Sequence, residues 1–459
     1  MRALAKIVVV LVLLAVIGGG AWWSAGRGAG PQILIRQPSK TIGLATPFAI
    51  AIDAPGGRLA HVEVSIEQNG QLHRVVSLDS AGLQGVTRET ADRAVITGVV
   101  GKRGTPELEA GPARLIVHAA RPAFFGLRLI PADAAQDVTV RLDPPRISAL
   151  STFHYINQGG AEFVVYRASP PDVESGVRVG DLTYPGFPAA GAGIKGDENL
   201  RVAFFALLHD QDPGVPMTLY ARDPSGIEAV AALDHRVFPK PFAHSKIDIT
   251  DAFMQRVVPA IAAGTPDMKL STAPQDLLAS FLKINSELRK RNGETIAALA
   301  RTSSPQMLWT DAFQALGNAA VEAKFADSRT YFYEGKEIDH QTHLGFDLAV
   351  TAHIPVLAAN KGTVVYASDL GIYGNCVILD HGLGVQSLYA HLSSIDAKIG
   401  DHVEKGHVMG KSGMTGLAGG DHLHFTMLVN GHPVNPVEWW DPKWMQDRVL
   451  RKIAEAGRQ

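Results

Sequence analysis

Residues 422–429 read His-Leu-His-Phe-Thr-Met-Leu-Val, a run whose length and apolar content are typical of a β-strand. Side chains two residues apart on a strand point to the same face, whereas in a helix they diverge by about 200°. The run therefore predicts that the imidazoles of His422 and His424 lie on one face of a sheet. Taken alone this pattern is weak, because two histidines on an exposed strand carry little information.

A second motif, His-Leu-Gly-Phe-Asp at residues 343–347, adds a carboxylate. If the motif lies on a strand, its even offset keeps His343 and Asp347 on one face. Imidazoles and a carboxylate with no cysteine nearby are the ligand set of a catalytic zinc site, in which three protein ligands leave one position for water. The pKa of such a water falls to about 7, which makes it a nucleophile at neutral pH.

A third motif, Tyr-Ala-His-Leu at residues 389–392, lies between the other two and contributes His391. The three motifs in this order resemble the lysostaphin/LytM-type zinc metallopeptidases, which cut peptidoglycan peptides. The resemblance extends from about Arg329 to Pro436. It implies a compact, mainly antiparallel β-sheet domain with zinc in a groove.

The resemblance also divides the five candidate residues, which spacing alone does not do. It implies that His343, Asp347 and His424 bind Zn²⁺. It implies that His391 and His422 are catalytic residues beside the metal. An imidazole that is not a ligand can take the proton of the water or donate to the developing oxyanion, and which of the two residues does which stays open.

Other residues near the motifs are given structural or supporting roles. Thr426 stands where many relatives have glutamate after His-Leu-His-Phe, so we expect a difference in the groups that support the ligands rather than a loss of activity. His340 lies three residues before His343, and this odd offset predicts that it points away from the site. Cys376 is expected to be a packing residue, and the basic run 289–291 a solvated helix face.

The composition limits the classes of protein. Of the 459 residues, 46% are hydrophobic and 19% are charged, which excludes disorder as the dominant state. Lys and Arg number 43 against 45 Asp and Glu, so the formal net charge is -2 and a globally basic nucleic-acid binder is excluded. The single cysteine excludes an internal disulfide framework and a cysteine-based zinc site.

The N-terminal segment, residues 1–30, is predicted to be a membrane anchor. Arg2 and Lys6 precede an uncharged run at residues 7–25, about the length that spans the hydrocarbon core of a bilayer. Basic residues on this side orient the amino end toward the cytoplasm. A cleaved signal peptide is the alternative, because small residues in the run could form a cleavage site. We expect a single-pass protein of the cell inner membrane with its bulk in the periplasm.

The rest of the chain is predicted to be multidomain and mainly β. Short alternating segments broken by turn residues predict an immunoglobulin-like β-sandwich at residues 31–144 and a second β-rich domain at 145–243, which could be two sandwiches or one elaborated domain. A period of 3.6 residues predicts a helical segment at 244–320. The antiparallel β peptidase domain is expected at 321–440, followed by a tail helix at 441–459.

The favoured function is a membrane-anchored, exported zinc metallo-endopeptidase that hydrolyses peptide cross-links of peptidoglycan. Its partners would be peptidoglycan peptide stems, the membrane through the N-terminal helix, and proteins of the cell envelope. One alternative is a non-catalytic relative that binds and activates another cell-wall hydrolase, although such relatives lose zinc ligands and this chain has all of them. A surface adhesion module would leave the three motifs unexplained. Glycine bridges and D-alanine-containing cross-links both suit the family, so the bond stays open.

Overall fold

The computed structural model describes residues 2–25, 27–55, 58–79, 81–349 and 351–458. The chain divides into two units, one formed by Met1–Pro145 with Arg222–Ala229 and the other by Arg146–Ala221 with Val230–Gln459. Both are mainly β, which confirms the predicted fold class. The individual domain boundaries given above stay predictions.

The first unit begins with helix α1 (Arg2–Ala25), in which Lys6–Ser24 is long and apolar enough to cross a membrane or to serve as a signal sequence. Its strands are β1 (Gln32–Gln37), β2 (Thr41–Ile42), β3 (Thr46–Asp53), β4 (His61–Gln68), β5 (Gln71–Asp79), β6 (Thr87–Arg88), β7 (Arg93–Val100), β8 (Gly111–Ala123) and β9 (Arg128–Val140). They form two sheets, ordered β1–β3–β7–β6 and β2–β9–β8–β4–β5. Phe48 of one sheet and Val64 of the other belong to one buried core. The apolar side chains that recur at every second position of these strands therefore face the space between the two sheets.

The second unit starts with a further β-rich part, of which residues 222–229 belong to the first unit. Its strands are β10 (Arg146–Ala149), β11 (His154–Asn157), β12 (Ala161–Ser169), β13 (Glu174–Val179), β14 (Leu182–Pro185), β15 (Phe187–Pro188), β16 (Leu200–Ala206), β17 (Met217–Arg222), β18 (Glu228–Ala232) and β19 (His235–Phe238). They form the sheets β10–β12–β16–β15 and β14–β13–β17–β18 and the pair β11–β19. Phe204 packs on Trp439 with ring centroids 5.6 Å apart, and Lys452 Nζ donates to the buried Glu162 at 2.8 Å. The strands of this part thus share a core with the C-terminal part of the chain.

A small sheet combines one strand that precedes the helices with two strands that follow them. Strand β20 (His244–Ile249) pairs in parallel with β22 (Asp327–Tyr333), which pairs antiparallel with β23 (Lys336–His343). Residues 244–249, which the sequence pattern assigns to the helical segment, are therefore a strand. The physical reason is that exposure alternates with a period of two along this stretch.

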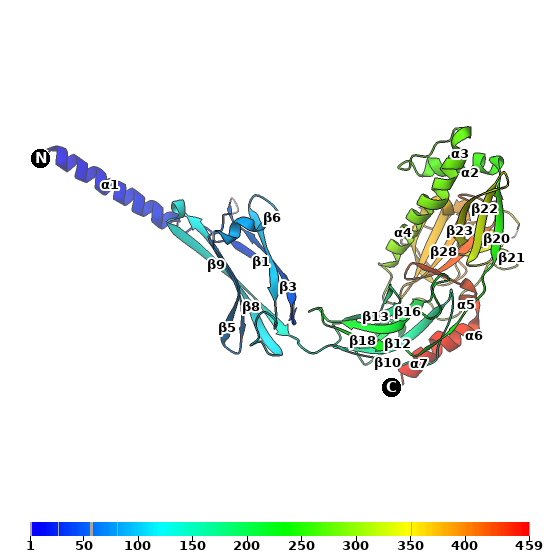
Figure 1. The fold of residues 1–459 in the computed structure, drawn as a ribbon, viewed down its shortest axis with the longest axis horizontal. Helices are drawn as coiled ribbons and strands as arrows, with labels where there is room; N and C mark the ends of the chain where they lie inside the picture. The colour runs from blue at the N-terminus through cyan, green and yellow to red at the C-terminus, as the bar shows by residue number, and fades with distance from the viewer. Residues whose placement is uncertain (1, 26, 56–57, 80, 350, 459) are drawn as a thin grey trace. The chain divides into compact units, whose positions relative to one another are not determined.

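The helices follow this strand and lie beside the small sheet (Figure 1). They are α2 (Asp251–Gly264), α3 (Leu277–Lys283), a π-helical turn (Ile284–Leu288) and α4 (Arg289–Ala300). Helix α2 begins where the hydroxyl oxygen of Thr250 accepts a hydrogen bond from the amide of Phe253 at 3.2 Å, as the predicted cap requires. Met254 and Val257 of α2 are buried against Tyr331 of β22, which fixes the helices to the sheet.

The C-terminal part is built on a large sheet. Its strands are β21 (Ala320–Ala323), β24 (Phe346–Ala349), β26 (Gly362–Asp369), β27 (Asn375–Gly382), β28 (Val385–Leu392), β30 (His402–Val403), β32 (Leu423–Val429) and β33 (His432–Val434). Their order is β21–β24–β32–β28–β27–β26–β30, with β33 paired to β32, and every pair is antiparallel. A second sheet has the order β25–β31–β29, with bounds Pro355–Leu357, Val408–Lys411 and Ser394–Ile395. Helices α5 (Pro436–Trp440), α6 (Pro442–Met445) and α7 (Arg451–Ala456) end the chain.

Candidate metal centre

The register of the large sheet brings the two motifs together. Asp347 of β24 is directly opposite His424 of β32, and the carboxylate oxygen Oδ1 lies 2.9 Å from the ring nitrogen Nδ1 of His424. His343, the last residue of β23, places its Nε2 at 2.9 Å from the same oxygen and 3.0 Å from that nitrogen. One ligand atom from each of the three buried residues therefore lies within 4.8 Å of the others.

The His-Leu-Gly-Phe-Asp motif is not a single strand. Strand β23 ends at His343 and β24 begins at Phe346, so the chain turns between them and the even-offset argument was wrong about the local structure. Gly345 lies in this turn, where a Cβ atom would be 2.5 Å from Nε2 of His424 and 2.6 Å from Oγ1 of Thr426. The motif requires glycine here because the backbone approaches a metal-site imidazole too closely for any side chain.

Hydrogen bonds on the outer side of each ring decide which nitrogen faces the centre. Nδ1 of His343 lies 3.1 Å from the carbonyl oxygen of Lys324, so this nitrogen carries the proton and Nε2 has the lone pair. The hydroxyl of Thr426 donates to the carbonyl of Leu344 at 3.0 Å and accepts from Nε2–H of His424 at 3.1 Å. This relay leaves the lone pair of His424 on Nδ1, the atom that faces Asp347.

The three facing atoms fit a metal cation. Two imidazole nitrogens and a carboxylate oxygen, all common zinc ligands, lie 2.9–3.0 Å from one another, close enough for one cation to be shared among them. Burial acts to raise the pKa of Asp347, but the imidazoles of His343, His422 and His424 outweigh burial and hold that pKa well below its usual range. Burial lowers the pKa of His424 to about 4, so this ring is neutral at pH 7.

Arg329 of β22 holds the second oxygen of the carboxylate. Its Nη2 donates to Oδ2 of Asp347 at 3.1 Å, and its Nε lies 3.5 Å from Oδ2 of Asp327. Asp347 therefore presents Oδ1 to the imidazoles of His343, His422 and His424. Sequence reasoning missed this residue, because an arginine on an alternating strand has no local signal that reveals a partner on another strand.

His391 and His422 lie beside the three ligand residues. Their ring centroids are 4.9 Å apart, and the ring of His391 is 5.6 Å from that of His424. Each ring donates Nδ1–H to a backbone carbonyl, that of Thr415 at 2.8 Å for His391 and that of Gly420 at 2.9 Å for His422. Nε2 of His422 lies 3.4 Å from Oδ1 of Asp347, and both rings line the groove at the metal centre.

A β-bulge sets the direction of His391. Between two paired positions, β27 advances two residues from Asn375 to Val377 while β28 advances three, from Tyr389 to Leu392. His391 lies within the longer side, with φ at 62°, in the left-handed region that non-glycine residues rarely adopt. Bulges are common beside active sites, where they redirect a side chain. The local distortion thus orients an imidazole that regular pairing would direct elsewhere.

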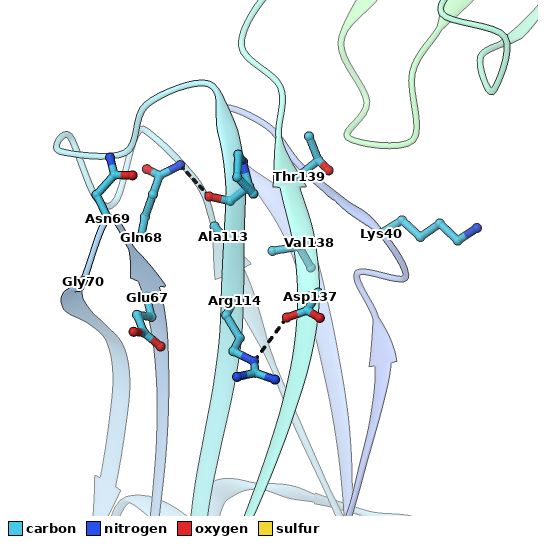
Figure 2. Close-up of a pocket in the computed structure, with 11 residues that line it drawn as sticks. Lys40, Glu67, Gln68, Asn69, Gly70, Ala113, Arg114, Asp137, Val138 and Thr139 are labelled. Carbon is cyan, nitrogen blue, oxygen red and sulfur yellow. Dashed lines mark hydrogen bonds and ion pairs between the residues drawn. The ribbon is translucent and has the colours of Figure 1, made fainter.

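The five predicted site residues share one groove of about 930 Å³ in the second unit. Another pocket lies over strands β4, β8 and β9 of the first unit, and Figure 2 shows its lining. There Arg114 Nε pairs with Asp137 Oδ1 at 3.2 Å, and no imidazole is among the lining residues. His340 points out of the metal centre, as its offset predicts, with its side chain 61% exposed and bonded to Thr330 and Glu337.

Comparisons with known proteins agree with this geometry. Residues 341–436 match the model of Peptidase family M23. The chain is 43% identical over 95 residues to the DD-carboxypeptidase/endopeptidase Mpg of Neisseria meningitidis serogroup B, covering 21% of this chain and 22% of that protein. It is 38% identical over 96 residues to the peptidoglycan DD-endopeptidase ShyA of Vibrio cholerae, with the same two coverages of 21% and 22%.

Among solved structures, the catalytic domain of lysostaphin from Staphylococcus simulans is 28% identical and covers 28% of this chain and 98% of that one, with a TM-score of 0.24. The sheet and its His-Asp-His centre define a metallopeptidase-type domain. Residues 341–436 are a domain of the M23 family of metallo-endopeptidases. The match spans only 22% of the length of the relatives named above, so it concerns this domain and not the upstream parts.

Proposed function

We propose that this chain is an exported zinc metallo-endopeptidase that hydrolyses peptide cross-links of peptidoglycan. The observation that carries the proposal is the convergence of His343, Asp347 and His424 beside two further imidazoles in one groove. The M23 domain and its similarity to peptidoglycan endopeptidases support the substrate. The relatives include DD-endopeptidases, so we propose a cross-link that contains D-amino acids rather than a glycine bridge.

The donor set favours zinc among the biological metals. Two imidazoles and one carboxylate, with a position left for water, form the ligand set of catalytic zinc sites. When bound, zinc would polarise the scissile carbonyl and lower the pKa of the attacking water. The protein contributes orientation, because Lys324, Thr426 and Arg329 each hold the outer side of one ligand.

His391 and His422 are proposed to act on the substrate and the water. Burial, together with the neighbouring His422 and His424, lowers the pKa of His391 well below its usual range, so this ring is neutral and its Nε2 can accept a proton. Burial acts to lower the pKa of His422, but the carboxylate of Asp347 outweighs it and raises that pKa. Between them the two rings can take the proton of water and donate a hydrogen bond to the oxygen that gains charge.

We also propose that helix α1 remains as a single-pass anchor in the cell inner membrane. The apolar stretch Lys6–Ser24 supports this, as do the basic residues on its N-terminal side. The catalytic domain would then lie in the periplasm, where it meets peptidoglycan stems and proteins of the cell envelope. A cleaved signal sequence would export the same domain without the anchor.

The test uses the full chain purified in detergent. We expect zinc near one equivalent per chain by elemental analysis, and release of peptides from purified peptidoglycan that mass spectrometry identifies as products of cross-link hydrolysis. His424→Ala should abolish both zinc binding and hydrolysis, because two ligands do not hold the metal. His340→Ala is the matched control, since this exposed histidine lies three residues from a ligand and outside the centre.

Two results would contradict the proposal. Full hydrolysis by the His424→Ala variant would show that the metal centre is not the catalytic site. A wild-type chain that binds no zinc and cleaves no peptidoglycan, yet stimulates a separate cell-wall hydrolase, would instead support the regulatory function.

A further inference from the structure

Part of the groove wall comes from chain segments that lie outside the family match. Phe253 and Arg256 of α2, Phe281 of α3 and Arg289 of α4 line the same groove as the metal centre. Arg289 belongs to the basic run 289–291 that the sequence pattern assigns to a solvated face. The structure contradicts that assignment for this one residue, because its side chain is half-buried and lines the groove.

The guanidinium of Arg289 is held in place by a neutral partner. Its Nε donates to the carbonyl oxygen of Asn285 at 3.1 Å, and its Nη2 donates to Oδ1 of the same residue at 2.6 Å. Asn285 is fully buried, and its own amide donates to Oδ2 of Asp339 at 2.7 Å. These bonds orient the cation without neutralising it, since an amide has no net charge.

No ion pair neutralises Arg289 among the residues that the structure describes. The next two residues of the run differ in this respect. Nζ of Lys290 lies 4.0 Å from Oε1 of Glu294, and the guanidinium of Arg291 forms an ion pair with the carboxylate of Asp267. Arg289 thus has an oriented positive charge with further N–H donors free to bind an anion.

The π-helical turn makes this arrangement possible. The amide of Arg289 donates to the carbonyls of Ile284 and Ser286, not to that of Asn285, which an α-helix would use. The carbonyl of Asn285 is therefore available to the side chain of Arg289. Single π-helical turns inside helices are rare and frequent at functional sites, which agrees with a role in the groove.

Arg289 is one aromatic ring away from the metal centre. Tyr373 packs against the metal-site imidazole of His424, with ring centroids 5.5 Å apart, and it also lines the groove. The segment that contains Tyr373 is fixed to the helix of Arg289, because the amide of the neighbouring Ile372 donates to Oδ1 of Asn292 in α4 at 3.1 Å. An anionic group bound by Arg289 would therefore lie close to the bond that is cleaved.

We propose that Arg289 is a specificity-determining residue that binds a free carboxylate of the substrate peptide near the scissile amide. The inference rests on the proposed endopeptidase function and adds a preference for anionic peptides. A guanidinium pairs with a carboxylate through two parallel hydrogen bonds, which gives both affinity and direction. Two carboxylates of a cross-linked peptide fit the same chemistry. One is the C-terminal carboxylate of the peptide, and the other is on the side chain of the residue whose amine forms the scissile amide.

The test compares three synthetic cross-linked peptides with the full zinc-loaded chain. One has both carboxylates free, one has the carboxylate next to the scissile amide converted to an amide, and one has the terminal carboxylate converted. We expect amidation of the carboxylate that Arg289 binds to raise KM roughly tenfold or more, the loss typical of a charge-assisted hydrogen bond. The peptide whose KM rises identifies the source.

Variants then assign this preference to Arg289. In Arg289→Gln the three peptides should have equal KM values, and the zinc content should equal that of the wild type. Arg289→Lys should keep part of the preference, because the charge remains and the forked geometry is lost. Lys290→Gln is the matched control, as it removes a neighbouring cation that lies on the exposed side of the same helix and should keep the wild-type preference.

Equal KM values for all three peptides in the wild-type chain would overturn the inference while leaving the endopeptidase function intact. So would an unchanged preference in Arg289→Gln. The melting transition and the zinc content show whether Arg289→Gln folds. If it does not fold, the test uses Arg289→Lys instead. A full wild-type preference in Arg289→Lys would overturn the proposed forked contact. Failure of the proposed function itself looks different, since no peptide would then be cleaved.

Discussion

Two histidine–aspartate pairs of this chain have the same chemistry in different surroundings. In the first unit, Nδ1 of His118 lies 2.6 Å from Oδ1 of Asp133, with side chains 42% and 70% exposed. In the second unit, Nε2 of His343 lies 2.9 Å from Oδ1 of Asp347, with side chains 6% and 11% exposed. The exposed pair is the shorter of the two, yet water screens it, and among the described residues it belongs to no group that could hold a metal.

The difference shows what a metal centre needs beyond an ion pair. The buried pair has a third ligand in His424, and backbone or hydroxyl groups fix the tautomer of each imidazole. Burial also keeps these groups from being satisfied by water, so their charges act on one another and on a bound cation. The contrast predicts that substitutions around the buried pair change zinc binding and turnover strongly, whereas substitutions around the exposed pair change little.

The largest effect expected in this comparison is at His391, which belongs to the buried centre but is not a ligand. His391→Asn should lower kcat by roughly 10²- to 10⁴-fold, the usual contribution of a general acid or base, with the zinc content unchanged. Asparagine is the suitable replacement, because it tolerates the left-handed backbone at φ 62° better than alanine does. Steady-state kinetics and elemental analysis on the same sample test this.

A variant with an unchanged kcat would show that His391 only packs beside the metal centre. A variant that loses zinc would show instead that the ring supports the ligands, since its centroid is 5.6 Å from that of His424. The expected result, low kcat with full zinc, separates a residue that acts on the substrate or water from one that binds the metal.

A smaller effect is expected at Thr426, whose hydroxyl connects His424 to the carbonyl of Leu344. Thr426→Val keeps the shape of the side chain and removes this relay, so the proton of His424 is no longer directed to Nε2. Zinc affinity should fall by about 10- to 100-fold, as for other groups that orient a ligand. Competition with a chelator of known affinity measures this without reference to activity.

Thr426→Ser is the matched control, because it restores the hydroxyl and should restore zinc affinity. If Thr426→Val binds zinc as tightly as the wild type, the relay does not set the tautomer. A loss shared equally by the serine variant would point to packing at this buried position instead.

The sequence could single out five residues that line one groove, because each lies in a short motif with its own spacing. It could not indicate the residues that orient these five side chains through hydrogen bonds. Thr426 acts through a carbonyl 82 residues away, and Arg329 through a carboxylate on another strand. Such roles depend on strand register and on turns, which the local pattern does not contain.

The fold shows the same division between local and distant information. The run that holds His424 was predicted as a strand from its length and apolar content, which are local properties, although burial does not alternate along β32 because all seven of its residues are buried. Residues 244–249 were assigned to the helical segment because the helical pattern that follows them was extended too far. Arg289 was misjudged for a related reason: only the π-helical turn and the buried Asn285 show that its guanidinium faces the groove.

The smallest effect is expected at the exposed pair. Asp133→Asn should change the free energy of unfolding by less than about 0.5 kcal/mol, because an ion pair in contact with water contributes little. Zinc content and peptidoglycan hydrolysis should equal those of the wild type, whereas Asp347→Asn, the matching change in the buried pair, should lose zinc. Urea denaturation of both variants, with elemental analysis, measures the contrast. A clear loss of stability in Asp133→Asn would mean that the exposed pair supports the first unit, and that burial alone does not separate the two.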